Sequence, residues 1–331
     1  MIRSRILGVG RCLPERAVTN FDLAEMFETS DEWIRQRTGI VERRFAEAGV
    51  YCSDLAREAA QNALENAGIE AGDLDFIIFA TLSPDHHFPG SGVYLQEKMG
   101  LAGIGCLDVR NQCTGFLYSL AVADAFVRVG MYQRILVIGA EVHSSALNFT
   151  NAGRDVAVLF GDGAGAVVVG LSDDGDRGIL ATHMHADGRY ADKLKLDIWD
   201  ISKKPYITSE TLSNGDIWPK MTGKEVFKHA VTRIPEVVEA VLKECDLTIP
   251  DVDLFIPHQA NLRINQFAAH RLGVPEEKFY SNIESYGNTT AASIPIALSE
   301  VLEKGMIAEN DLIMMVAFGS GFTWAASLMR W

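Results

Sequence analysis

The sequence predicts an α/β protein made of two similar halves that pack together. The first observation is a repeated order of elements: a helix over residues 53–68 leads through an acidic turn into a strand, and a helix over 224–245 does the same. The second is a glycine-rich segment at 160–166 that is echoed at 318–327. Apolar residues at helical spacing and short buried runs support these assignments. A repeat of this size favours two packed domains with sites where they meet.

A polar turn at residues 171–177 divides the chain. We therefore expect one domain over residues 1–172 and a second over residues 173–331. The second half contains an irregular segment rich in Trp, Tyr and Pro, at 198–219, which we expect to be a long loop. Loops of that length are usually functional or mobile.

The composition favours a cytoplasmic protein that binds neither nucleic acid nor membranes. The net charge of −14 opposes the neutralisation of phosphates on which nucleic-acid binding depends. No apolar run is long enough to cross a bilayer, and we expect no signal peptide. The five dispersed cysteines suit a reducing compartment and lack paired metal-ligand spacing. We expect no bound metal, since the adjacent His86 and His87 have no spaced third ligand.

Residues 20–37 predict a pair of helices, with Trp33 and Arg37 on one helix face. An aromatic ring beside a guanidinium can hold a flat base by stacking and cation–π attraction. An ordinary surface pair explains the same spacing, and this segment alone favours that second interpretation.

Residues 108–120 predict the end of a strand, a tight turn and a helix. Apolar residues recur at helical spacing after Cys113, which puts this cysteine at or near a helix N-terminus. Unpaired backbone N–H groups and the helix dipole favour a thiolate there, and the thiolate is the form that attacks carbonyls. A free cysteine is also common as a small core residue, so this segment leaves both interpretations open.

The glycine-rich segment at residues 160–169 resembles a phosphate-binding loop, but it lacks the lysine and the following helix. We expect a strand whose glycines let two backbones pack closely.

His258 and Asn288 occupy turns in the second half that are comparable with the turn at Cys113. His258 follows a predicted strand and precedes a helix from Asn261 to Leu272, and Asn288 lies at a glycine-marked turn before another helix. By the repeat, we expect all three at carboxyl ends of strands, where open α/β sheets place ligand sites. Each residue alone is more often structural; together they predict a shared site.

The sequence resembles β-ketoacyl-acyl carrier protein synthase III, a family of thiolase-fold condensing enzymes. The resemblance covers essentially the whole chain and implies a five-layered αβαβα architecture. It is carried by residues 29–33 and 37–40, Cys113 with Gly115 and Phe116, and residues 160–166, 258–263, 287–289 and 318–324.

The resemblance implies an acyltransferase that starts fatty acid synthesis by decarboxylative Claisen condensation. Cys113 would take an acyl group from acyl-CoA, with its own backbone N–H and that of Ser320 forming an oxyanion hole. His258 and Asn288 would hold the thioester oxygen of malonyl-acyl carrier protein and stabilise the enolate left by loss of carbon dioxide. Asn suits that position because it donates a neutral hydrogen bond. Coenzyme A enters as a substrate thioester, and no cofactor is expected.

The resemblance also assigns substrate contacts outside this triad. Trp33 and Arg37 match positions that stack on the adenine of coenzyme A, which reverses the preference for an ordinary surface pair. Arg154 matches an accessory contact, and Phe227 and Phe318 match further substrate-binding positions, Phe318 beside the reaction centre.

Two protein partners are implied as well. Phe88 matches a loop residue that reaches the partner subunit's acyl pocket, so the resemblance implies a homodimer. Lys228, Arg263 and Arg271 would form a basic patch that docks the acidic carrier protein, or they are ordinary solvated charges.

The chain departs from the short-chain housekeeping members of the family at three places. Residues 110–112 replace small residues before the nucleophile, Lys224 stands where many members have asparagine, and the 198–219 segment is longer. Residues 83–87 and Gln112 look closer to relatives that take medium-chain or aromatic acyl groups, including the anthraniloyl-condensing enzyme of alkylquinolone synthesis. The alternative is therefore a specialised condensing enzyme of secondary metabolism with such an acyl donor.

Overall fold

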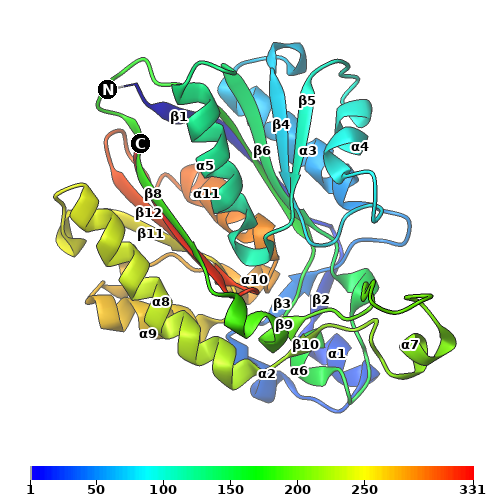
Figure 1. The fold of residues 1–331 in the computed structure, drawn as a ribbon. Helices are drawn as coiled ribbons and strands as arrows, with labels where there is room; N and C mark the ends of the chain where they lie inside the picture. Colours follow the sequence, from blue (N-terminus) through cyan, green and yellow to red (C-terminus); the bar gives the residue numbers. More distant parts are fainter. Residues whose placement is uncertain (1) are drawn as a thin grey trace.

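A computed structural model describes residues 2–331 of the chain, and Figure 1 shows two main sheets with helices between and outside them. Helix α3 (Cys52–Ala67) covers the outer face of the first sheet, and α8 (Gly223–Glu244) with α9 (Leu262–Leu272) covers the outer face of the second. Helices α5 (Gly115–Arg128) and α11 (Ser293–Glu303) fill the space between the sheets. The layers run helix, sheet, helix, sheet, helix, which confirms the five-layered αβαβα architecture.

The first sheet has five strands in the order β1-β7-β6-β4-β5. Strand β4 is parallel to both neighbours, whereas β7 is antiparallel to β6 and β1. Strand β5 is therefore an edge strand. The bounds are Ser4–Cys12 (β1), Phe76–Ala80 (β4), Gly105–Val109 (β5), Arg134–Glu141 (β6) and Gly163–Leu171 (β7).

The second sheet has four strands in the order β11-β12-β13-β8. Strand β11 is parallel to β12, and β12 forms an antiparallel pair with β13. The bounds are Gly178–Ala186 (β8), Leu254–Pro257 (β11), Leu312–Gly319 (β12) and Thr323–Arg330 (β13).

The remaining elements lie below the two sheets in the view of Figure 1 or at their edges. The short strands are Ala17–Thr19 (β2), Glu42–Arg44 (β3), Leu194–Lys195 (β9) and Lys220–Met221 (β10). The remaining helices are Asn20–Met26 (α1), Asp31–Thr38 (α2), Ser91–Lys98 (α4), Arg154–Ala157 (α6), Ser209–Ser213 (α7) and Ile283–Tyr286 (α10).

The central core explains why α5 forms where the sequence predicts it. The residues of α5 at helical spacing point into the space between the sheets and are buried there: Phe116, Leu117, Leu120, Ala123 and Val127. Burying one large apolar side chain contributes about 1.5–3 kcal/mol. The helix is therefore fixed against both sheets, and so is the turn that precedes it.

The glycine-rich segment forms strand β7, as expected, and its glycines serve close packing. A Cβ added to Gly165 would lie 2.7 Å from the backbone nitrogen of Ile296 in α11. A larger residue would push the central helix away from the first sheet.

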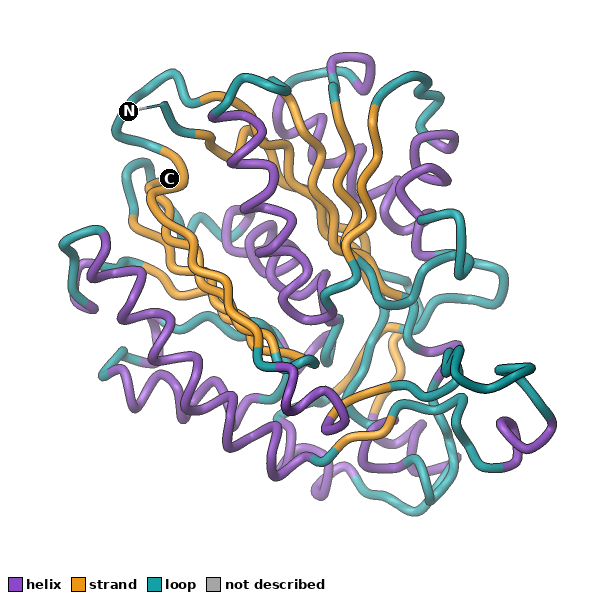
Figure 2. The backbone as a smooth tube through the Cα atoms, viewed as in Figure 1, coloured by secondary structure: helices purple, strands orange, loops and turns teal. Residues whose placement is uncertain are grey.

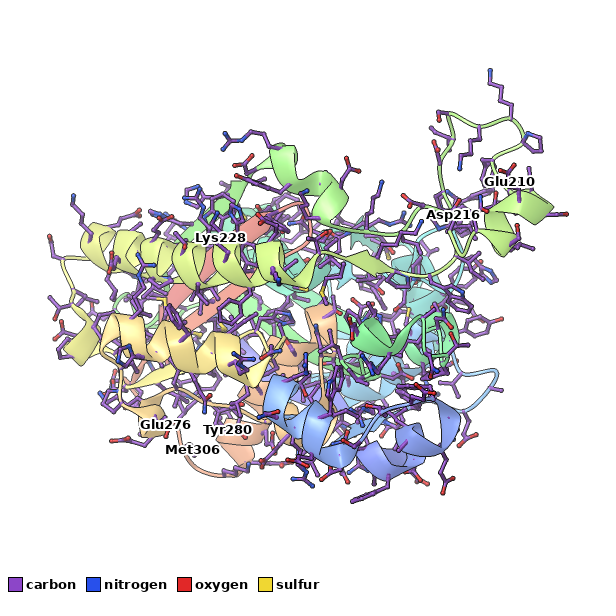
Figure 3. All side chains as sticks on the ribbon, turned by 90° about the horizontal axis from the view of Figure 1, so that it is seen from below. Glu210, Asp216, Lys228, Glu276, Tyr280 and Met306 are labelled. Atoms are coloured by element: carbon purple, nitrogen blue, oxygen red, sulfur yellow. The ribbon has the colours of Figure 1, made fainter. Side chains whose placement is uncertain are left out.

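The segment at residues 198–219 is a long loop that carries only α7, and it projects from the body of the molecule (Figures 1 and 2). Figure 3 shows Glu210 and Asp216 on this projection. The imidazole of His87 stacks on Trp199, with ring centroids 4.3 Å apart and planes 13° apart. This contact ties the base of the loop to the turn after β4. Within residues 2–331, no helix combines the length and apolar character needed to span a bilayer.

Candidate active site

Cys113 lies in a single turn of 3₁₀ helix between the end of β5 and the start of α5. Gln112 has a φ of 44°, in the left-handed region that side-chain-bearing residues rarely adopt. Gly319 at the end of β12 closes against the cysteine: an added Cβ would lie 2.7 Å from Cys113 Cβ and 3.2 Å from its Sγ. The sulfur is therefore held where the two sheets converge.

The environment of the sulfur favours the neutral thiol of Cys113 over its thiolate. Burial raises the pKa of the Cys113 thiol to about 12, and the charge of Glu141 raises it further, against the lowering effect of the backbone N–H groups of Cys113 and Ser320. The sequence left a reactive thiolate and a buried core thiol as alternatives, and this pKa favours a neutral thiol in the resting protein, because burial outweighs the helix N-terminus. The two backbone donors nevertheless meet at the sulfur, as an oxyanion hole requires.

His258 follows strand β11, and its backbone N–H donates to the carbonyl of Val316 at 2.7 Å. Its Nδ1 lies 2.6 Å from Ser293 Oγ, and the same oxygen accepts the Gln259 N–H at 3.4 Å. With the Gln259 N–H as one donor to Oγ, the serine is free to donate its own proton to Nδ1, and in that tautomer the proton of the neutral ring is on Nε2. Burial lowers the pKa of His258 to about 3, so the ring is neutral.

The Nε2 atom of His258 is buried and has no hydrogen-bond partner within residues 2–331. A buried N–H without a partner costs free energy, so such groups are rare in folded proteins. This donor is available to a substrate.

Asn288 does not follow a strand, so the expectation that all three residues lie at strand ends is wrong for it. It comes after the short helix α10 and forms a single parallel bridge with Phe160. Its Oδ1 accepts the backbone N–H of Thr290 at 2.9 Å. With the oxygen occupied, the amide presents its NH₂ group, which is the donor that an enolate needs.

A cavity of about 430 Å³ brings Cys113, His258 and Asn288 together, and we call it the first cavity. The predicted catalytic residues thus share one site. Other predicted substrate-binding residues also line it, together with Lys224: Trp33, Arg37, Phe227 and Phe318.

Trp33 lies at the first cavity beside two guanidinium groups. The Cζ atoms of Arg37 and Arg154 each lie 4.5 Å from the ring centroid of Trp33. Ser30 caps the N-terminus of α2 by accepting the Trp33 N–H at 3.1 Å, which fixes the start of this helix. A flat base can stack on this tryptophan in place of one guanidinium.

A second cavity of about 570 Å³ also reaches Cys113. Cys113, Phe160 and Leu194 line both cavities, so the nucleophile lies where they meet. The apolar wall of the second cavity comes from loops after β4, β6 and β9: Leu82, Pro84, Val142, Ala146, Leu147 and Leu196.

Sequence reasoning missed four residues that support this site. Ser293 orients His258, and Thr290 holds Asn288 while its Oγ1 lies 2.7 Å from His143 Nε2. The carboxylate of Glu141 accepts the Ser83 hydroxyl at 2.6 Å and the Leu82 N–H at 3.1 Å. Glu141 and His143 directly follow the predicted strand over 134–140, so they lie at the same end of the sheet as Cys113. That position could have indicated from the sequence that they belong to the site.

The other predicted residues lie outside both cavities. The side chain of Phe88 is 81% exposed on the loop after β4. Lys228 on α8 and Arg263 on α9 are exposed, and Figure 3 shows Lys228 on its helix. Arg271 is also exposed, and it donates to the carbonyl of Val231 at 3.4 Å.

Known proteins resemble this chain over its whole length. The family model for the 3-oxoacyl-acyl-carrier-protein (ACP) synthase III matches residues 107–188, and the model for the C-terminal region of that family matches 242–331. A β-ketoacyl-acyl-carrier-protein synthase III of Geobacillus kaustophilus is 48% identical over 326 residues, 98% of each chain.

Two solved structures show the same fold. The 3-oxoacyl-acyl-carrier-protein synthase III of Aquifex aeolicus superposes with a TM-score of 0.91 at 42% identity, covering 99% of this chain and 100% of that one. The priming β-ketosynthase of the R1128 polyketide biosynthetic pathway superposes with a TM-score of 0.89 at 34% identity, covering 99% and 96%.

Proposed function

Because the chain belongs to the 3-oxoacyl-acyl-carrier-protein synthase III family, we propose that it condenses an acyl group from acyl-CoA with malonyl-acyl carrier protein. The product is a β-ketoacyl-acyl carrier protein, and the reaction starts fatty acid synthesis. The observation that carries this proposal is the single cavity that Cys113, His258 and Asn288 share.

In the first half-reaction, Cys113 Sγ attacks the thioester carbonyl of acyl-CoA. The backbone N–H groups of Cys113 and Ser320 stabilise the oxyanion of the tetrahedral intermediate. The carbon–sulfur bond to coenzyme A then breaks, and the thiol proton of Cys113 leaves with the departing coenzyme A. Since the resting sulfur is a buried thiol, the enzyme holds a nucleophile that becomes charged only as it reacts.

In the second half-reaction, the Nε2–H of His258 and the NH₂ of Asn288 donate to the thioester oxygen of the malonyl group. Loss of carbon dioxide leaves an enolate whose negative oxygen these neutral donors stabilise. The enolate carbon attacks the acyl carbonyl on Cys113, and the cysteine leaves and regains a proton. Neutral donors suit this step, because a carboxylate in either place would repel the enolate.

Substrate binding follows the two cavities. The adenine of coenzyme A stacks at Trp33 with Arg37 and Arg154, and the pantetheine arm runs through the first cavity past Phe227 and Phe318. The acyl group then occupies the second cavity beyond Cys113. The protein's own groups supply every donor and nucleophile in these steps, so the proposed reaction uses no cofactor.

The acidic carrier protein docks beside the first cavity. Exposed cations on α8 and α9 provide the complementary charge: Lys228, Arg263 and Arg271. Opposite charges of this kind mainly raise the association rate and its sensitivity to salt.

We also propose that two copies of the chain form a homodimer in the cytoplasm. Each subunit has two domains, over residues 1–172 and 173–331. Strand β5 has an unpaired edge, and open edges favour pairing with another chain. Exposed apolar side chains on and near this side of the molecule support such an interface: Phe88, Val93, Leu107, Trp199, Ile201 and Ile207.

A second candidate is a condensing enzyme of secondary metabolism that takes a medium-chain or aromatic acyl-CoA. The second cavity favours it, because about 570 Å³ lies within the range of roughly 300–1,000 Å³ that holds drug-sized ligands. An acetyl group needs far less space than that.

Intact mass spectrometry after incubation with acyl-CoA tests both candidates. We expect a covalent acyl adduct that Cys113→Ala abolishes, and acylation of this variant at the original rate would refute the mechanism. Acyl-CoAs from acetyl to decanoyl, with benzoyl and anthraniloyl, then separate the candidates: a preference for acetyl-CoA would exclude the second one.

A further inference from the structure

The wall of the second cavity contains polar side chains beside its apolar ones. Most of these polar groups are already hydrogen-bonded within the protein. The Ser83 hydroxyl donates to Glu141 at 2.6 Å, Lys195 pairs with Asp192 at 2.9 Å, and Ser145 donates to a backbone carbonyl at 3.3 Å. Asp85 and Ser320 are occupied as well, by Ser53 and by the carbonyl of Leu194 respectively. Groups with protein partners have little left to offer a ligand.

Gln112 is an exception. It directly precedes Cys113, lines the same cavity and is only partly exposed. Its side-chain amide has no hydrogen-bond partner within residues 2–331, although it offers two donors and an acceptor. The left-handed backbone at this residue, with a φ of 44°, is fixed by the buried turn around Cys113. Strain of this kind is typical of functional sites.

His143 is the second exception. The residue is 6% exposed, and its ring packs on Phe160 with the ring centroids 4.7 Å apart and places Nε2 at 2.7 Å from Thr290 Oγ1. Its Nδ1 makes no hydrogen bond within residues 2–331, yet the residue lines the second cavity. Burial lowers the pKa of His143 to about 3, so this nitrogen belongs to a neutral ring.

We propose that Gln112 and His143 form a hydrogen-bonding subsite for the acyl group, and that the preferred acyl-CoA has a hydroxyl or amino group on its β-carbon. This inference rests on the proposed function. Gln112 directly precedes Cys113, and His143 packs on Phe160, which lines both cavities together with Cys113. Both side chains therefore belong to the end of the second cavity nearest the nucleophile, where the first carbons of an acyl group on Cys113 would lie. An apolar acyl group would cover both polar groups without replacing their hydrogen bonds to water.

The class of substituent follows from the hydrogen bonds that the two side chains can donate and accept. An amide both donates and accepts, and a neutral imidazole nitrogen does one or the other. A hydroxyl or amino group can satisfy both partners at once. In a 3-hydroxyacyl chain the β-carbon is C3, which carries the hydroxyl group. In an aromatic acyl group such as benzoyl, the β-carbon is the ortho carbon of the ring. These two sources share the recognition chemistry.

The test compares matched pairs of acyl-CoAs on the intact protein. The rate of Cys113 acylation, followed by mass, is measured for 3-hydroxybutyryl-CoA against butyryl-CoA and for 2-aminobenzoyl-CoA against benzoyl-CoA. We expect the substituted member of at least one pair to have a kcat/KM about tenfold higher, the size expected for one added hydrogen bond. The pair that responds shows whether the natural group is aliphatic or aromatic. Equal values within both pairs would overturn the subsite.

Two substitutions connect the preference to the named side chains. Gln112→Leu keeps the bulk and removes the amide, and His143→Phe keeps a ring and removes the nitrogens. We expect each to bring the ratio of kcat/KM within the responding pair down toward one, whereas Ser145→Ala, at a cavity residue that already has a partner, leaves that ratio unchanged. An unchanged ratio in Gln112→Leu would overturn the inference. Since His143 is buried, Gln112→Leu alone decides if His143→Phe does not fold.

The same data distinguish this inference from the proposed function. Equal acylation rates within both pairs of acyl-CoAs, in the protein and in Gln112→Leu alike, refute the subsite and leave the condensing reaction standing. Failure of every acyl-CoA, acetyl-CoA included, to acylate Cys113 refutes both.

Discussion

The two cavities that meet at Cys113 differ in what their walls can do. The first has cationic and aromatic groups along its wall, and the unpartnered Nε2 of His258 near the sulfur. The second is mainly apolar, with most of its polar groups already satisfied. The difference indicates different roles for the two cavities. The reacting groups that develop negative charge are bound in the first cavity, and the unreactive part of the acyl group is bound in the second.

The largest effect should come from the donors of the first cavity. Replacing His258 or Asn288 by Ala removes a hydrogen bond to the enolate, and we expect condensation to fall about 10²- to 10³-fold. Acylation of Cys113 should change by no more than about threefold, because it uses other donors. Single-turnover assays of each half-reaction measure this; equal losses in both would show that the two cavities do not divide the chemistry.

A second prediction concerns the resting charge of the sulfur. Because burial raises the pKa of Cys113 to about 12, the thiolate fraction should rise about tenfold for each pH unit well below that value. Alkylation of the free enzyme by iodoacetamide should therefore increase about 100-fold between about pH 7 and about pH 9. A plateau within this range would mean that the helix N-terminus outweighs burial. Cys113→Ala provides the background rate.

A smaller effect is expected at the tryptophan of the first cavity. Trp33→Ala removes the stacking surface for adenine, and we expect the KM for acyl-CoA to rise about tenfold with kcat nearly unchanged. An acyl thioester of N-acetylcysteamine lacks the adenine and provides the control, since its kcat/KM should be the same in both proteins. A similar loss of kcat/KM with this truncated substrate would mean that Trp33→Ala acts by disturbing the fold and not by removing the adenine contact.

The smallest effect tests how the second cavity influences the first. His143 in the second cavity hydrogen-bonds Thr290 Oγ1, and the Thr290 N–H holds Asn288. We expect Thr290→Val to slow condensation about fivefold while acylation is unchanged. Thr289→Val is the matched control, because this neighbour is also buried and the hydrogen bond to His143 belongs to Thr290. Equal effects of both substitutions would contradict the connection.

Local pattern predicted a large part of this molecule. Helical spacing indicated α5, α3 and α8, because each buries one continuous stripe of apolar residues. The strand ends before Cys113 and His258 were visible for the same reason. The grouping of the catalytic residues also followed, once the repeat and the family resemblance were combined.

Features that depend on distant parts of the chain were not predictable in this way. Asn288 is placed by a bridge to Phe160, far away in sequence, rather than by a strand of its own. The pKa of Cys113 depends on burial by several elements, and that burial reversed the local effect of the helix end. The second cavity is formed by loops after three separate strands, and no single segment reveals it.

The contact between Gly319 and Cys113 limits how this enzyme could be altered. Even one methyl group on that glycine would collide with the Cβ of the cysteine and would press on its sulfur. A redesign of the acyl specificity should therefore keep Gly319 and change the loops that line the second cavity. We expect Gly319→Ala to be inactive even if the protein folds.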